Sequence, residues 1–149
     1  SQYRQTNFSA PGPQFNAQTL GLSRTVIDWN NDFERASQRA QQQNRPMLVR
    51  VTASWCGYCT KMKQETYTNN GIIRDIESTF VAIEVDADQN RKLVEQLGVQ
   101  SLPATLVISP DMRIVDREQG FRSAEQLSSV LRRHLRRAEL ETNMQVAIR

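Results

Sequence analysis

Two cysteines stand three positions apart in this chain of 149 residues, as Cys56 and Cys59, and the sequence contains no others. They follow a β-rich run at 47–53 and open a segment of helical composition. Residues three apart share one face of a helix, so the two sulfurs can meet. Unpaired N–H groups and the helix dipole stabilise a thiolate in the first turn. We therefore predict that Cys56 is an exposed nucleophile that attacks a substrate disulfide, and that the deeper Cys59 resolves the mixed disulfide.

Two other interpretations of the pair stay open at this point. The cysteines could form half of a metal site shared between two chains, although no second pair exists and the single histidine, His134, lies far along the sequence. They could also be inert core cysteines. A redox pair needs no cofactor, because both electrons reside on the two sulfurs. We expect neither a metal nor a cofactor.

The elements that position the pair follow from apolar periodicity and turn residues. Helices are predicted within 25–46, after Cys56, at 71–79, at 90–98 and from Ser123, where Gln126 completes a capping box. The first of these helices carries an apolar stripe of Trp29, Phe33, Ala36 and Ala40. Strands are predicted at 47–53, 80–88, 102–110 and 112–121. Strands separated by helices imply parallel crossovers, and the last close pair implies an antiparallel edge. The expected fold class is α/β, a mixed central sheet with helices on both faces.

Composition divides the chain into three parts and excludes some functions. Residues 1–24, rich in Gln, Asn, Ser, Pro and Gly, are expected to form an extended leader, 25–138 a single domain and 139–149 a C-terminal tail with weak signals. No apolar run is long enough to span a membrane. The net charge of +3 is too small to indicate a nucleic-acid partner. The arginines at 132–137 are expected to form a solvated helix face.

Four stretches together resemble the thioredoxin superfamily. They are MLVRVTASWCGYC, FVAIEVDADQN, GVQSLPATLVISP and a late Gly-Phe before the last helix. The resemblance covers about residues 25–137. Within this superfamily, the chain most resembles secreted thioredoxin-like proteins related to the C-terminal domain of the bacterial thiol–disulfide interchange protein. The stretch ETYTNNGII after the cysteines supports this similarity. The resemblance implies a thioredoxin fold and redox chemistry at Cys56 and Cys59.

The same resemblance implies a substrate-binding surface around the pair. Trp55 matches the aromatic residue that shields the disulfide, and Pro103 matches a cis-proline that faces it. A cis Leu102–Pro103 bond leaves the backbone of Leu102 free to pair with an extended substrate segment. Gly57 and Tyr58, between the cysteines, tune the redox potential, and the alternative role for Tyr58 is that of an exposed aromatic side chain that flanks the substrate groove.

One pair of positions departs from the family pattern. Cytosolic thioredoxins carry a buried Asp six positions before the first cysteine and a Lys on the neighbouring strand, whereas this chain has Arg50 and Glu84 there. A charge-reversed pair beneath the disulfide would make Glu84 the proton acceptor for Cys59, and Arg50 would favour thiolates. The alternative is a partly exposed ion pair worth about 0–1 kcal/mol.

The predicted function is thiol–disulfide exchange with protein substrates, with reduction as the favoured direction. The partners are protein disulfides and an unidentified redox partner, with no nucleic acid. The expected location is the periplasm or another extracytoplasmic compartment, with the cytoplasm as the alternative. Two rival functions stay open: a thioredoxin-like binding module whose cysteines are structural, and a disulfide oxidase or isomerase.

Overall fold

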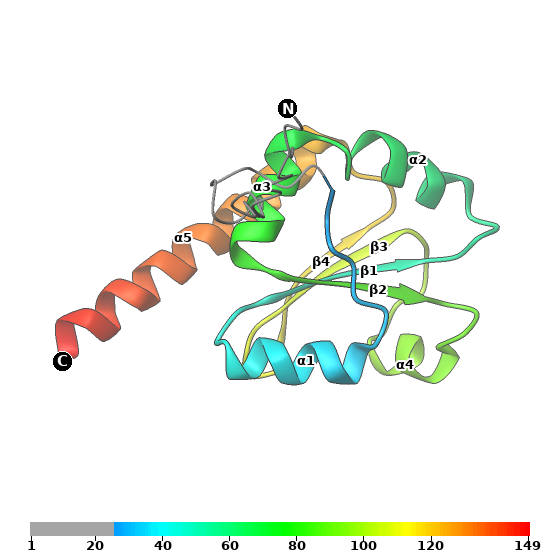
Figure 1. The fold of residues 1–149 in the computed structure, drawn as a ribbon. Helices are drawn as coiled ribbons and strands as arrows, with labels where there is room; N and C mark the ends of the chain where they lie inside the picture. The colour runs from blue at the N-terminus through cyan, green and yellow to red at the C-terminus, as the bar shows by residue number, and fades with distance from the viewer. Residues whose placement is uncertain (1–25) are drawn as a thin grey trace, which may run out of the picture.

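The computed structural model describes residues 26–149, so the leader predicted at 1–24 lies outside the described residues. The described chain forms a four-stranded sheet in the order β2-β1-β3-β4 (Figure 1). Its strands are β1 (Met47–Thr52), β2 (Val81–Asp86), β3 (Ala104–Ile108) and β4 (Ile114–Gln119). β1 pairs in parallel with β2 and antiparallel with β3, and β3 pairs antiparallel with β4. The predicted mixed sheet is confirmed.

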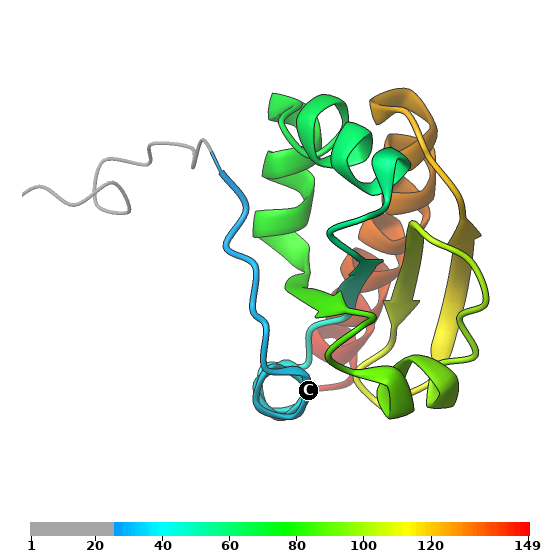
Figure 2. The same ribbon diagram turned by 90° about the vertical axis from the view of Figure 1, so that its right-hand side faces the viewer.

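Helices cover both faces of the sheet, as predicted (Figures 1 and 2). On one face lie α1 (Phe33–Gln42) and α4 (Arg91–Gln96), and on the other α2 (Gly57–Glu65), α3 (Asn70–Thr79) and α5 (Ala124–Ile148). Alternate residues of β1 point to opposite faces. Val49 therefore packs in the cluster beneath α1, and Leu48 packs in the cluster beneath α3 and α5.

This alternation places two polar side chains beneath α2. Arg50 and Thr52 follow Leu48 at steps of two, so they share its face of the sheet. Leu48 is fully buried, and Thr52 is 4% exposed. β1 thus carries its polar positions toward the helix that begins at the cysteines, and its purely apolar positions toward α1.

The expectation that every helix-separated strand is parallel is wrong for β3. The connection between β2 and β3 begins after Asp86 and ends before Ala104, at the same end of the sheet, so β3 runs back antiparallel to β1. Its helix, α4, has six residues and none of them is buried. Such a short element does not carry the chain back along the sheet, which a parallel crossover requires.

The predicted apolar stripe of the first helix is also wrong at Trp29. Asp32 caps α1, its side chain accepting a hydrogen bond from Arg35 N at 3.0 Å, so the helix begins at Phe33. The residues before it pair with the edge of the sheet instead: Asn30 N donates to Ala82 O at 2.9 Å. Trp29 consequently packs against the cluster beneath α3 and α5, on the face opposite α1.

The last helix extends beyond its predicted apolar face. The capping box of Ser123 and Gln126 is confirmed. α5 then continues to Ile148, so the predicted tail at 139–149 is the end of this helix and projects from the domain (Figure 1). Apolar side chains in this segment, such as Leu140 and Met144, are exposed. The segment therefore has no buried apolar face, and this is why its sequence shows only weak helical signals.

No helix of the described part of the chain is long and apolar enough to cross a membrane.

Candidate active site

The two cysteines lie where β1 ends and α2 begins, and they form a disulfide with a Cα–Cα separation of 5.2 Å. Cys56 is the N-cap of α2, and its Sγ accepts a hydrogen bond from Cys59 N at 3.2 Å. The backbone N–H of Cys56 donates to Ala53 O at 3.1 Å, which closes the turn between strand and helix. The predicted position of the pair at a helix N-terminus is confirmed, with Cys56 one residue before the first turn.

The prediction that Cys56 is exposed is wrong for the disulfide form. Cys56 is 7% exposed and Cys59 is 2% exposed. Both pack with Ala53, and Leu102 covers this small cluster. The expected order holds, because Cys59 is the deeper of the two. Cys56 is therefore the sulfur-bearing residue nearer the surface.

Aromatic side chains border the disulfide at the surface. Trp55 is 68% exposed and Tyr58 is 64% exposed. The Trp55 indole N–H donates to Asp88 Oδ2 at 2.9 Å, which orients the ring on the loop after β2. A Cβ added to Gly57 would meet no atom within 4 Å, so the space over the motif is open.

Pro103 lies close to Cys59. The Leu102–Pro103 peptide bond is cis, as the resemblance implied. Pro103 is buried and, with Cys59, lines one small cavity, whereas Leu102 is partly buried against the disulfide. The structure therefore brings the predicted binding residues together around the sulfurs.

The charge-reversed pair is present beneath α2. Arg50 and Glu84 are register partners on β1 and β2. Arg50 Nε donates to Glu84 Oε2 at 2.8 Å, and a second guanidinium nitrogen contacts the same oxygen. Their side chains are 12% and 29% exposed. Lys63 Nζ lies 3.9 Å from this oxygen, so two cations share one carboxylate.

Arg50 and Glu84 differ in their position relative to Cys59. Arg50 and Lys63 line the same cavity as Cys59, whereas Glu84 is not among its lining residues. The cavity has about 10 Å³ of room for the centre of a water molecule, which is close to the minimum for a single water.

Two aromatic rings hold Arg50, and sequence reasoning missed both. The guanidinium carbon lies 3.8 Å from the ring centroid of Trp29 and 5.1 Å from that of Tyr67. The two rings meet edge to face at 5.0 Å. The N-cap preference of Asp32 could have moved Trp29 out of the predicted helix. No local signal marks Tyr67, which follows α2 in the chain.

The hydroxyl of Tyr67 keeps its proton over a wide pH range. Burial raises the pKa of Tyr67 above its usual value, against a hydrogen bond with Thr105 and the positive charge of Arg50, which both lower it. The Tyr67 and Thr105 hydroxyls lie 3.4 Å apart. They partner each other on the wall of the cavity.

A row of polar side chains crosses the sheet at this level. In register, Glu84 on β2 is followed by Arg50 on β1, Thr105 on β3 and Glu118 on β4. Glu118 accepts from Arg122 Nε at 2.9 Å. Polar groups buried in a sheet cost free energy unless they are paired, and each member of this row has a hydrogen-bond partner.

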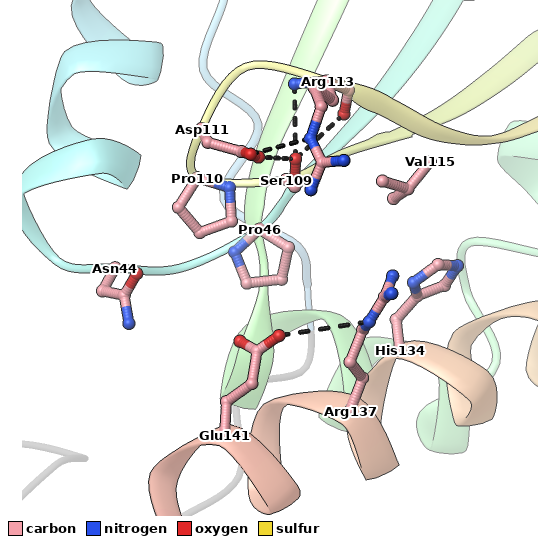
Figure 3. A pocket seen from close by; sticks show the side chains of 10 residues that line it. All are labelled: Asn44, Pro46, Ser109, Pro110, Asp111, Arg113, Val115, His134, Arg137 and Glu141. Carbon is pink, nitrogen blue, oxygen red and sulfur yellow. Dashed lines mark hydrogen bonds and ion pairs between the residues drawn. The ribbon is translucent and has the colours of Figure 1, made fainter. Parts of the chain in front are cut away.

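A second cavity, of about 270 Å³, lies at the opposite end of the sheet (Figure 3). Arg137 and His134 of α5 face the turn between β3 and β4 across it. His134 Nε2 lies 3.0 Å from Asp116 Oδ2, which also accepts from Arg133 at 2.8 Å. Burial raises the pKa of Asp116, but these two partners outweigh it and lower the pKa overall. Arg133 of this helix face is thus paired, and the cavity is remote from the cysteines.

Among residues 26–149, no group of three or more His, Cys, Asp and Glu residues is placed to hold a metal ion.

The fold and the site define a class of protein. A mixed sheet with a Cys-x-x-Cys disulfide at a helix N-terminus, beside a cis-proline, is a thioredoxin fold with its redox pair. Residues 33–135 match the model of the thioredoxin-like domain family, and the chain belongs to that family.

Known relatives agree with this membership. The thiol:disulfide interchange protein DsbD of Campylobacter jejuni is 28% identical over 127 residues, which are 81% of this chain and 22% of that protein. Thioredoxin of Staphylococcus aureus is 33% identical over 88 residues, 59% of this chain and 81% of that protein. The reduced C-terminal domain of Neisseria meningitidis DsbD shares the fold with a TM-score of 0.60 at 17% identity, covering 67% of this chain and 91% of that one. The chain thus spans about a fifth of the length of DsbD.

We predict that Trp29 and Arg50 stabilise the protein together. Trp29→Leu and Arg50→Met should be measured singly and in combination. Either change alone removes the contact between the cation and the ring, so the double variant should lose about 0.5–2 kcal/mol less free energy of unfolding than the sum of the two single losses. Urea denaturation measures it. The matched control is Trp55→Leu with Arg50→Met, since Trp55 is exposed and does not stack on Arg50. Additive effects of Trp29→Leu and Arg50→Met would refute the interaction.

Proposed function

We propose that this chain is a thiol–disulfide oxidoreductase that exchanges the Cys56–Cys59 pair with protein substrates, working as a reductase. The observation that carries the proposal is the disulfide at the start of α2, with Cys56 as the N-cap. Unpaired N–H groups and the dipole of α2 favour a thiolate at this position. An exchange reaction between thiols and disulfides needs such a thiolate as its nucleophile.

The reaction proceeds in two exchanges. The reduced Cys56 thiolate attacks one sulfur of a substrate disulfide, a bond forms between them, and the other substrate sulfur leaves as a thiolate. Cys59 then loses its proton and attacks Cys56 Sγ. The Cys56–Cys59 bond forms, the bond to the substrate breaks, and the second substrate sulfur leaves as a thiolate. Two electrons pass to the substrate, and a separate redox partner must return them.

Substrate binding is assigned to the surface around the pair. The exposed rings of Trp55 and Tyr58 offer apolar contact on one side of the disulfide. On the other side, the backbone of Leu102 beside the cis bond pairs with an extended substrate segment. The open space above Gly57 leaves room for that segment.

Glu84 is proposed as the proton acceptor for Cys59, and Arg50 as the cation that favours its thiolate. Arg50 lines the cavity beside Cys59 and holds the Glu84 carboxylate through two contacts with Oε2. Glu84 does not line that cavity and a guanidinium does not release its proton, so the transfer needs the Glu84 carboxylate to come within direct reach of the thiol in the reduced protein.

The proposed location is the periplasm or another extracytoplasmic compartment. The similarity to DsbD supports it, whereas the similarity to thioredoxin supports the cytoplasm as the alternative.

Disulfide reduction by this chain should depend on Cys56. With dithiothreitol as the electron source, the protein should accelerate the precipitation of insulin, and Cys56→Ser should reduce the rate to that of dithiothreitol alone, because the attacking sulfur is gone. Turbidity measures the rate. Equal rates for the two proteins would instead favour a thioredoxin-like binding module with structural cysteines.

The reduction potential should distinguish a reductase from an oxidase or isomerase. Arg50 and Lys63 favour thiolates and so raise the potential, but the similarity to thioredoxin supports a value closer to that protein's, about −270 mV, than to that of a strong oxidant, about −120 mV. Equilibration with glutathione, followed by alkylation of the free thiols, measures it. A potential near the higher value would overturn the proposed direction.

The role of Glu84 is tested by Glu84→Gln, which keeps the shape of the side chain and removes the carboxylate. We expect insulin reduction to slow by about tenfold near neutral pH, with a changed pH profile, because general base catalysis typically contributes at least this much. Glu118→Gln, at the far end of the polar row, is the matched control and should keep the native profile. An unchanged rate and profile for Glu84→Gln would remove Glu84 from the mechanism.

A further inference from the structure

The segment 98–103 connects α4 to β3, and it carries Leu102 and the cis-proline to the disulfide. Helix α4 gives this segment little support, because the helix has six residues and none of them is buried. The C-cap residue of α4, Leu97, is 7% exposed and packs in the cluster beneath α1. The position of the segment therefore depends on the contacts that the chain makes from Leu97 onward.

The start of the segment is bound by a side chain of the edge strand β4. Arg117 is the register partner of Leu106 on β3, and Leu106 packs in the cluster beneath α1, so both side chains lie on the face of the sheet that α1 and α4 cover. From this face, Arg117 Nη1 donates a hydrogen bond to Leu97 O at 2.7 Å. Hydrogen bonds from a charged donor are roughly twice as strong as those between neutral groups, so this contact ties the end of α4 to β4.

Gly98 lets the guanidinium lie against the backbone of the segment. Its φ is +69°, a left-handed conformation that commonly ends a helix and that glycine adopts without strain. A Cβ added to Gly98 would lie 3.3 Å from Arg117 Nη2 and 3.5 Å from Nη1, so the guanidinium occupies the space that a side chain at this position would need. The chain thus turns away from α4 in contact with Arg117.

The other end of the segment is bound where the same strand ends. The backbone N–H of Gly120, which directly follows β4, donates to Pro103 O at 2.7 Å. Between the two ends, Ser101 Oγ donates to Gln119 Oε1 at 3.4 Å. Successive positions along β4 thus hold the segment at its start, in its middle and at its end. Leu102 lies between these contacts and packs on the disulfide.

We propose that Arg117 is a positioning residue for substrate binding, which sets the place of the Leu102 backbone at the disulfide by holding the start of segment 98–103. This inference rests on the proposed function, because that function assigns the Leu102 backbone to an extended substrate segment. Hydrogen bonds weaken steeply when donor and acceptor are misaligned, so a displaced backbone loses affinity for such a segment. Arg117 lies on the face of the sheet opposite α2, and it therefore acts on binding and not on the exchange of bonds between sulfurs.

The test compares two substrates of the reduced protein. One is an extended peptide whose central cysteine forms a mixed disulfide with thionitrobenzoate, and the other is dithiobis(nitrobenzoate), which has no peptide backbone to pair with Leu102. Attack by Cys56 releases coloured thionitrobenzoate from both. Arg117→Met, which removes the hydrogen bond, should lower the rate constant for the peptide about tenfold and leave the rate constant for dithiobis(nitrobenzoate) within about twofold.

Two further variants change the same contact from its two sides. Arg117→Lys keeps a cationic donor and should recover part of the lost rate with the peptide. Gly98→Ala places a Cβ against the guanidinium and should lower the peptide rate as Arg117→Met does. Arg113→Met is the matched control, because Arg113 directly precedes the same strand and its side chain pairs with Asp111, and it should leave both rates unchanged.

Hydrogen exchange follows the segment without any substrate. The amides of 98–102 should exchange about tenfold faster in Arg117→Met than in the native protein or in Arg113→Met, because the start of the segment is released. A peptide rate that is unchanged in Arg117→Met would overturn the assignment. An equal fall with both substrates would also overturn it, because the effect would then lie on the thiolate.

Failure of the insulin assay in the native protein is a different result. It would remove the proposed function, and amide exchange alone would then decide whether Arg117 holds the segment.

Discussion

The site is organised around a guanidinium that is held beneath the redox helix. A side chain with this charge is destabilising in a sheet interior unless its partners replace water. Here Glu84 accepts from two of its nitrogens, and the ring of Trp29 lies 3.8 Å from its centre. The pairing of Asn30 with β2, the position of Tyr67 after α2 and the register of β1 with β2 all serve to surround Arg50.

This constraint bears directly on redox chemistry. Thioredoxin-like proteins work by changing the relative stability of a disulfide and two thiols, and a nearby charge acts on that difference. Arg50 and Lys63 share one carboxylate, so the wall of the cavity at Cys59 keeps a net positive charge. Positive charge favours the thiolate, and the dipole of α2 does the same at Cys56. In the proposed reaction, the two sulfurs would be stabilised as anions by different parts of the structure.

The packing of the pair also sets the path of attack. Burial of Cys59 at 2% and of Cys56 at 7% leaves the disulfide accessible from one side, between the exposed rings and the Leu102–Pro103 segment. In the proposed reaction, a substrate would approach as an extended segment along this surface. The cluster beneath the sulfurs would stay out of contact with it and act through its charge.

The sequence by itself determined the features that depend on neighbours along the chain. The strand before Cys56, the helix after it, the capping box at Ser123 and the alternation of β1 are local patterns, and the resemblance placed Pro103 beside the pair. The directions of the strands, the packing of Trp29 and the vicinity of Tyr67 and Thr52 to Cys59 were decided only by the tertiary structure. These features depend on contacts between residues far apart in the sequence, or on which face of the sheet a side chain occupies. Periodicity in the sequence specifies neither the partner of a strand nor the surroundings of a buried polar side chain.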